Sequence, residues 1–109
     1  MRSVTHLKRL VTISIPVLNE ADNIEPLMER LRAVAEINHR YEFEFLFTDN
    51  ASSDATFEKL ADQARTDSRV RVIRFTRNFG HQAAVTAGLD FANGDAVVVM
   101  DGDLQDPPE

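Results

Sequence analysis

The chain of 109 residues contains no cysteine. It can therefore form no disulfide and has no thiolate metal site and no cysteine nucleophile, which fits a reducing compartment. Long hydrophobic runs are also missing, because the longest unbroken apolar stretch is residues 96–100, far short of the roughly 20 residues that a membrane helix needs. Residues 1–10 lack the apolar core of a secretory signal, and we interpret them as a flexible basic leader.

Positive charge is in deficit, with 12 Lys and Arg against 18 Asp and Glu and a net charge of −6. This balance argues against nucleic acid as the main partner. A composition of 43% hydrophobic and 28% charged residues is typical of a globular protein. The length suits one domain at most, so we expect residues 11–109 to form a single folded unit.

Strand and helix signals alternate along the chain. Apolar and β-branched runs predict strands at residues 11–17, 43–47, 70–75 and 96–100. Apolar residues at helical spacing predict a helix from about Asn23, a second around residues 57–64 with Ser53 or Asp54 as N-cap, and a third over residues 82–92. The first and last strands are apolar on both faces, which predicts a doubly wound α/β fold with helices on both sides of a mainly parallel sheet.

Polar residues follow each predicted strand. In such sheets ligands bind outside the carboxyl ends of the strands, so these residues are expected to meet on one rim. They are Asn19 and Glu20, Asp49 and Asn50, residues 77–81, and residues 101–103. The sequence stops just past the last of these clusters, and we therefore expect it to be part of a larger domain.

Asp101 and Asp103 flank Gly102 immediately after the last strand. Gly102 permits a turn that would aim both carboxylates at one hard cation, and Gln105 would add a neutral oxygen. Residues 90–109 hold six acids and no Lys or Arg, so a bound metal would relieve their repulsion. The alternative is that the two acids form a solvated turn.

Positive charge and a helix start precede this acidic segment. Arg77 lies near the rim, and His81 leads into a helix whose N-terminus offers free N–H groups to a phosphate. His81 would equally suit a packed position in the first turn, whereas Arg69 and Arg71 suit ordinary surface charges. Asp49 would accept hydrogen bonds from a base or a ribose, as the acid after the second strand does in dinucleotide folds.

Four motifs in this order resemble the start of a family 2 glycosyltransferase, in its polyprenyl-phosphate branch. They are residues 13–20 (ISIPVLNE), 49–56 (DNASSDAT), 77–84 (RNFGHQAA) and 101–109 (DGDLQDPPE). The resemblance runs from about residue 11 to residue 109. It departs from the common family pattern at Leu18, where Tyr is usual, at Asn50 and Ala51, where Asp and Gly are common, and at Gly102, where Ala is common.

The resemblance implies the nucleotide-sugar half of a GT-A domain. Asp101, Asp103 and Gln105 match a metal-binding Asp-x-Asp-x-Gln that would hold Mg²⁺ or Mn²⁺, with Asp101 and Asp103 as the catalytic pair. Asp49 matches the aspartate that reads the base. Residues expected to contact the nucleotide-sugar are Pro16, Asn19, Glu20, Asp49, Arg77, His81, Asp101, Gly102 and Asp103.

The implied reaction transfers a hexose from a UDP- or GDP-sugar to a polyprenyl phosphate, with inversion at the anomeric carbon. The acceptor site and membrane segments would follow residue 109, which places the whole protein at the cytoplasmic face of a membrane and leaves this part with donor binding alone. Two alternatives remain. One is a non-catalytic nucleotide-binding module, and the other is a phosphatase of the haloacid dehalogenase type with Asp101 as nucleophile and Asp103 as acid and base.

Overall fold

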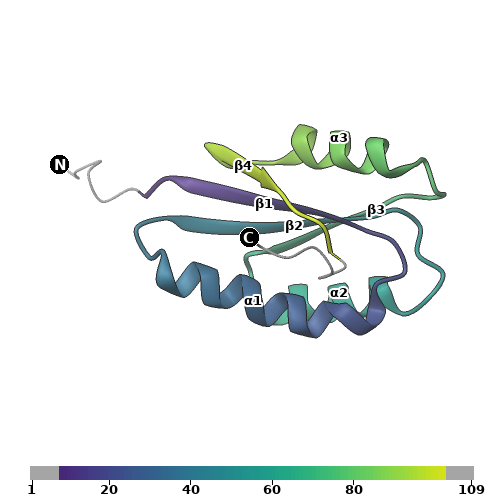
Figure 1. The fold of residues 1–109 in the computed structure, drawn as a ribbon, viewed down its shortest axis with the longest axis horizontal. Coiled ribbons are helices and arrows are strands. Elements are labelled where there is room, and N and C mark those ends of the chain that lie inside the picture. Colours follow the sequence, from purple (N-terminus) through teal and green to yellow (C-terminus); the bar gives the residue numbers. More distant parts are fainter. Residues whose placement is uncertain (1–7, 103–109) are drawn as a thin grey trace.

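A four-stranded parallel sheet forms the middle of three layers in the computed structural model, which describes residues 8–102 (Figure 1). Its strands, in the order β3-β2-β1-β4, are β1 (Leu10–Val17), β2 (Glu42–Asp49), β3 (Val70–Arg74) and β4 (Ala96–Val99). One face carries α3 (His81–Phe91), and the other carries α1 (Ile24–Ile37), preceded by the short 3-10 helix η2 (Ala21–Asn23), and α2 (Thr56–Thr66). The predicted α/β parallel architecture is confirmed.

β2 is longer than the sequence pattern predicts. It pairs with β1 over eight consecutive residues, from Leu10 opposite Glu42 to Val17 opposite Asp49. The partner strand therefore extends β2 by two polar residues beyond its apolar run. As a result, Asp49 is the last residue of a strand and is fixed by the sheet.

The predicted N-cap of α2 is wrong. Ala55 occupies the N-cap position, one residue after Asp54. The Asp54 carboxylate still accepts the backbone N–H of Thr56 at 2.9 Å, and its other oxygen accepts the N–H of Ala21 at 3.2 Å. Asp54 sits outside the cap position because it also joins α2 to the start of η2.

The apolar core lies between the sheet and the pair α1 and α2. Alternate residues of β1 and β2 point to this side, and α1 meets them with residues at helical spacing. Its largest fully buried members are Ile15, Ile24, Leu27, Met28, Leu31, Phe45, Phe47 and Leu60. The spacing that predicts α1 in the sequence thus marks the face that is buried.

The opposite face of β1 and β2 is buried but polar, so the expectation that the first strand is apolar on both faces is wrong. Thr12, Ser14, Glu44 and Thr48 are all buried there. α3 covers them closely, because a Cβ on Gly88 would stand 2.0 Å from the Ser14 hydroxyl. A glycine at that helix position is what allows the close approach.

Glu44 anchors this polar face. Its carboxylate accepts hydrogen bonds from Thr12 Oγ1 at 3.2 Å, Arg71 Nη1 at 2.8 Å and Asn93 Nδ2 at 3.2 Å. Arg71 also donates to the carbonyl of Phe91 at the end of α3. Arg71 is therefore ion-paired with a buried carboxylate and is not the ordinary surface charge that the sequence suggests.

β4 is largely exposed, which corrects the expectation of a strand covered on both faces. Val98 is 51% exposed and Val99 is 42% exposed. β4 lies at the sheet edge within residues 8–102, and α3 packs on β1 and β2. The apolar run therefore predicts the strand correctly, but it does not show whether helices cover the faces of that strand.

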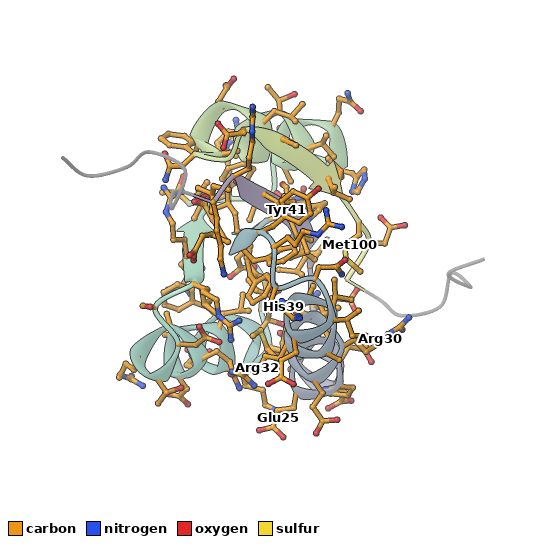
Figure 2. All side chains as sticks on the ribbon, turned by 90° about the vertical axis from the view of Figure 1, so that its left-hand side faces the viewer. Glu25, Arg30, Arg32, His39, Tyr41 and Met100 are labelled. Atoms are coloured by element: carbon orange, nitrogen blue, oxygen red, sulfur yellow. The ribbon has the colours of Figure 1, made fainter. Side chains whose placement is uncertain are left out.

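Asp67 ties α1 to the turn before β3. Its carboxylate accepts from Arg69 Nη2 at 2.8 Å and from Arg32 Nε at 3.2 Å, and Figure 2 shows Arg32 on the side of α1 that faces α2. Arg69 is thus paired and is not a free surface charge. The hydrogen bond from Arg69, with a smaller contribution from Arg32, lowers the pKa of Asp67 from 3.8 to about 2.

We predict that Asp67→Asn destabilises the protein by about 1–2 kcal/mol near neutral pH, because the folded state favours the ionised carboxylate. The lowered pKa means that this stabilisation is complete above the unfolded pKa and is lost as the pH falls from about 4 through about 2. Urea denaturation at several pH values measures it. Asp62→Asn, which breaks an exposed pair with Arg65, is the control and is expected to change little. An equal effect at pH 2 and pH 7 would contradict the assignment.

Candidate functional site

A cleft of about 510 Å³ opens at the carboxyl ends of β1 and β4, beside the start of α3. Its size is in the range of small-molecule sites in proteins. The residues that line it are Pro16, Val17, Leu18, Glu20, Asn50, Asn78, Gly80, His81, Ala84, Asp101 and Gly102. Segments from four separate parts of the chain therefore meet at the sheet edge that the strand order predicts.

Asp101 is held at the mouth of the cleft by the way the chain leaves β4. The backbone N–H of Met100 donates to the carbonyl of Ser14 at 3.0 Å, which continues the pairing with β1 past the last strand residue. Gly102 is buried, and a Cβ on it would stand 2.8 Å from Val17 Cγ1. The glycine thus lets the chain run directly against β1, and the Asp101 side chain stays exposed at the cleft.

A hydrogen-bonded clamp joins the loop after β1 to the loop after β2. Asn19 Oδ1 accepts the N–H of Ser53 at 2.8 Å and that of Asp54 at 3.3 Å, and Asn19 N donates to Ser52 Oγ at 2.8 Å. Ser52 Oγ in turn donates to Asp49 Oδ1 at 2.6 Å, and Ser52 N donates to the same oxygen at 3.0 Å. The clamp therefore fixes one carboxylate oxygen of Asp49.

The other oxygen of Asp49 is different. Asp49 is fully buried, and its Oδ2 has no hydrogen-bond partner within residues 8–102. Buried carboxylate oxygens are almost always paired, because an unpaired one loses its hydration without compensation. Asp49 does not line the cleft, so this unpaired oxygen is enclosed by the surrounding protein.

The ionised carboxylate of Asp54 stabilises the loops after β1 and β2 by accepting backbone hydrogen bonds from both. Desolvation opposes ionisation, but hydrogen bonds from Thr56 and Ala21 outweigh it and lower the pKa of Asp54. The carboxylate therefore stays ionised while it holds the starts of η2 and α2 together. In addition, Thr56 Oγ1 accepts the N–H of Glu20 at 2.8 Å.

The loop before α3 is shaped by stacking. The Arg77 guanidinium lies 4.2 Å from the centroid of the Phe79 ring, and Phe79 makes an edge contact with Phe75. Asn78 Oδ1 accepts the N–H of Gly80, whose positive φ of 98° suits glycine. The N–H of Phe79 donates to Asn50 Oδ1 at 3.0 Å, which attaches this loop to the end of β2.

The predicted site residues fall into three groups. Those that line the cleft are Pro16, Glu20, His81, Asp101 and Gly102. Those that are described but lie outside its lining are Asn19 and Asp49, which belong to the clamp, and Arg77, which stacks on Phe79. Asp103 and Gln105 lie outside the described residues. His81 is exposed as the first residue of α3, which differs from a packed position in the first turn.

Sequence reasoning places Asn50 on the rim without giving it a role, and it missed Ser52 as a site residue. Asn50 lines the cleft, and Ser52 holds the carboxylate of Asp49. A signal was available for both, since each belongs to the polar cluster that follows β2. Their separate roles depend on contacts with α3 and with the loop after β1, which no local pattern reveals.

Carboxylates are the groups in this cleft that suit a hard divalent cation. Asp101 and Glu20 both line it, and oxygen ligands are what Mg²⁺ and Mn²⁺ prefer. No cluster of three or more potential metal ligands occurs within residues 8–102. The carboxylates of the described residues could therefore supply only some of the ligands that such an ion needs.

Comparison with known proteins identifies the family. The family model described as "Glycosyl transferase family 2" matches residues 12–109. This chain belongs to glycosyl transferase family 2. It is 46% identical over 98 residues to an uncharacterised glycosyltransferase of Bacillus subtilis, covering 90% of this chain and 30% of that protein. It is 41% identical over 99 residues to a bactoprenol glucosyl transferase of Shigella phage SfV, covering 91% of this chain and 32% of the relative.

A solved glycosyltransferase structure has the same fold. A mannosyltransferase from Pyrobaculum calidifontis, in complex with GDP-Man and Mn²⁺, matches with a TM-score of 0.76 and 26% identity over 89% of this chain and 28% of its own. The fold is thus that of GT-A glycosyltransferases. This family 2 chain spans about a third of the length of its relatives. Within residues 8–102, no helix is long and apolar enough to cross a membrane.

We predict that Ser52→Ala destabilises the protein by about 1–3 kcal/mol, because it removes a donor to a buried carboxylate and an acceptor for Asn19 N. Chemical denaturation monitored by circular dichroism measures the change. Ser53→Ala is the matched control. The exposed hydroxyl of Ser53 contacts only Asn19 Oδ1, at 3.3 Å. We therefore expect Ser53→Ala to destabilise the protein by about 0.5 kcal/mol or less. Equal effects of the two substitutions would contradict the clamp.

Proposed function

We propose that the whole protein transfers a hexose from a UDP- or GDP-sugar to a polyprenyl phosphate, with inversion at the anomeric carbon, and that this chain binds the donor. The observation that carries the proposal is the cleft, which brings the Asp101 carboxylate and the start of α3 to one site. Membership of glycosyl transferase family 2 and the likeness to a bactoprenol glucosyl transferase support the reaction type.

A divalent cation, Mg²⁺ or Mn²⁺, completes the proposed site. Asp101 would hold it together with Asp103 and Gln105, and Asp101 and Asp103 form the proposed catalytic pair. When bound, such an ion neutralises the charge that develops on a nucleoside diphosphate leaving group. The similar mannosyltransferase structure contains Mn²⁺ and GDP-Man, which supports this ligand class.

The nucleoside is proposed to lie over the ends of β1 and β2. Asp49 is the residue proposed to accept an N–H of the base. Its Oδ2 is unpaired but enclosed, so the loops around it must open for the base to reach it, while Ser52 and Asn19 hold the carboxylate in place from the other side. Pro16 and Glu20 line the adjacent wall of the cleft. Asn19 contributes through the clamp, since its side-chain oxygen is already engaged by Ser53 and Asp54.

The phosphate groups are proposed to face the start of α3. The first turn of a helix offers unpaired N–H groups and the positive end of the helix dipole. His81 begins α3 at the cleft, and Arg77 adds a positive charge on the same loop. A phosphate acceptor is already an anion near neutral pH, so its oxygen needs no strong general base to act as a nucleophile.

The polyprenyl acceptor is the proposed link to a membrane. Its binding site and any membrane segments are assigned to the part of the protein after residue 109, which places the enzyme at the cytoplasmic face of a membrane. The supporting observation is the relative named as a bactoprenol glucosyl transferase, of which this chain covers 32% of the length. The net charge of −6 gives no support to a nucleic-acid partner.

Isothermal titration of the full-length protein with UDP- and GDP-sugars, with and without Mn²⁺, tests donor binding. We predict that Mn²⁺ strengthens binding of one donor at least about tenfold, because the ion links carboxylates to the diphosphate. Asp103→Ala should abolish this gain. Asp90→Ala, which removes an exposed acid on α3 that does not line the cleft, should leave it unchanged.

Turnover separates the proposed transferase from its alternatives. Incubation with a short-chain polyprenyl phosphate and the preferred donor should yield a glycosylated lipid phosphate. Metal-dependent nucleotide binding without sugar transfer would favour a non-catalytic module. Binding that changes neither with Mn²⁺ nor with Asp103→Ala would contradict the metal site.

A further inference from the structure

An exposed aromatic side chain lies beside the cleft, on the loop between β3 and α3. Phe79 is 46% exposed and is not part of the cleft lining, although its neighbours Asn78 and Gly80 are. A single exposed apolar residue is common in proteins. Here, however, Leu18 lines the same cleft from the loop after β1 and is also exposed. Two exposed apolar side chains therefore border the cleft.

The position of Phe79 is fixed by the rest of the fold. Its backbone N–H donates to Oδ1 of the buried Asn50 at 3.0 Å, and its ring makes an edge contact with Phe75 at 5.5 Å between centroids. The backbone of the loop is thus attached to the end of β2 while the ring remains at the surface. Because the ring is already ordered, a contact with another molecule costs little conformational entropy.

A free positive charge stacks on the same ring. The guanidinium carbon of Arg77 lies 4.2 Å from the centroid of Phe79, in the geometry of a cation–π contact. No carboxylate within residues 8–102 forms an ion pair with Arg77, whereas Arg69 and Arg71, earlier in the same segment, are both paired. The exposed Arg77 can therefore pair with an anion from another molecule.

The charge of this segment is opposite to that of the whole chain. Residues 68–89 contain four arginines and no Asp or Glu, although the net charge of the chain is −6. An anionic surface would repel most of the molecule and attract this segment. The nearby carboxylates of Glu20 and Asp101 line the cleft, where the proposed divalent cation would offset their charge. Figure 1 shows the loop at the end of the sheet where β1 and β2 also end.

We propose that the loop of residues 75–81, here called the Phe79 loop, contacts a lipid bilayer that contains anionic headgroups. The Phe79 ring enters the interfacial region, and Arg77 pairs with a lipid phosphate. Apolar side chains next to cations favour such interfaces, because the ring leaves water while the cation is attracted to the anionic lipid. The inference rests on the proposed function, since the contact places the cleft beside a membrane that holds the polyprenyl phosphate.

Hydrogen–deuterium exchange of the full-length protein tests the contact without nucleotide present. Vesicles of phosphatidylcholine alone are compared with vesicles of phosphatidylcholine and phosphatidylglycerol in equal amounts. We predict that exchange of the backbone N–H groups of residues 76–80 slows at least about threefold on the anionic vesicles, because a single Arg near such a surface contributes several-fold in affinity.

The turn between α1 and β2 is the matched control region. It lies at the opposite end of the sheet and exposes Tyr41 next to Arg40, so it has the same combination of aromatic ring and cation (Figures 1 and 2). Exchange of residues 38–42 should be equal on the two kinds of vesicle.

Two substitutions from aromatic residue to serine complete the experiment. Phe79→Ser should lose most of the slowing in residues 76–80, because the ring that enters the interface and supports Arg77 is removed. Its backbone bond to Asn50 is retained. Tyr41→Ser should slow like the native protein. If Phe79→Ser does not fold, the comparison of the two regions in the native protein still decides the proposal.

Each outcome supports or overturns the membrane contact. Slowing confined to residues 76–80 and lost in Phe79→Ser supports it. Equal exchange on both kinds of vesicle, or equal slowing in residues 38–42, overturns it. Slowing by UDP or GDP without vesicles, and none by phosphatidylglycerol, also overturns it and assigns the Phe79 loop to the donor. If sugar transfer to a polyprenyl phosphate still occurs in these cases, the proposed function stands and only the lipid contact is wrong.

Discussion

β1 is hydrogen-bonded on both of its edges, and the site depends on this arrangement. It pairs in parallel with β2 on one side and with β4 on the other, so three strands end at the same edge of the sheet. The loop after β1 begins at Leu18, 83 residues before Asp101 in the sequence, and the shared strand brings both of them, with Asp49, to one rim. Because parallel pairing requires a crossover after each strand, the helices necessarily cover the faces and leave this rim open.

The rim is held by backbone conformations that few residues favour. Asn19 has a φ of 55° and Ala51 a φ of 65°, both in the left-handed region. Asparagine tolerates that region, whereas alanine is strained there by roughly 1 kcal/mol. Hydrogen bonds among Asn19, Ser52 and Asp49 stabilise the strained loops. The family pattern has glycine at the position of Ala51, which the positive φ explains.

Much of the fold can be predicted from the sequence because its elements follow local rules. The spacing of Ile24, Leu27 and Leu31 marks the buried face of α1, and the β-branched residues of β1 predict a strand, although one of its two buried faces is polar. The exposure of β4 cannot be predicted in this way. An apolar run shows that a strand can be buried, but whether a helix covers that strand depends on how the layers pack.

The candidate site is only partly predictable for the same reason. Strand ends identify Glu20, His81 and Asp101 as neighbours, since topology alone places them on one rim. The roles of Asn19 and Asn50 depend on which backbone N–H groups face their side chains, at Ser53 and at Phe79 respectively. These contacts join segments about 30 residues apart in the sequence. Secondary-structure propensity is local and therefore carries no information about them.

A crystal structure of the full-length protein with Mn²⁺ and a nucleoside diphosphate sugar tests the central claim most directly. The account predicts an anomalous manganese peak at about 2.0–2.2 Å from an Asp101 carboxylate oxygen, with the diphosphate between the ion and the start of α3. The base should then lie against Asp49. Manganese bound elsewhere, or a nucleotide outside the cleft between β1, β4 and α3, would contradict the account.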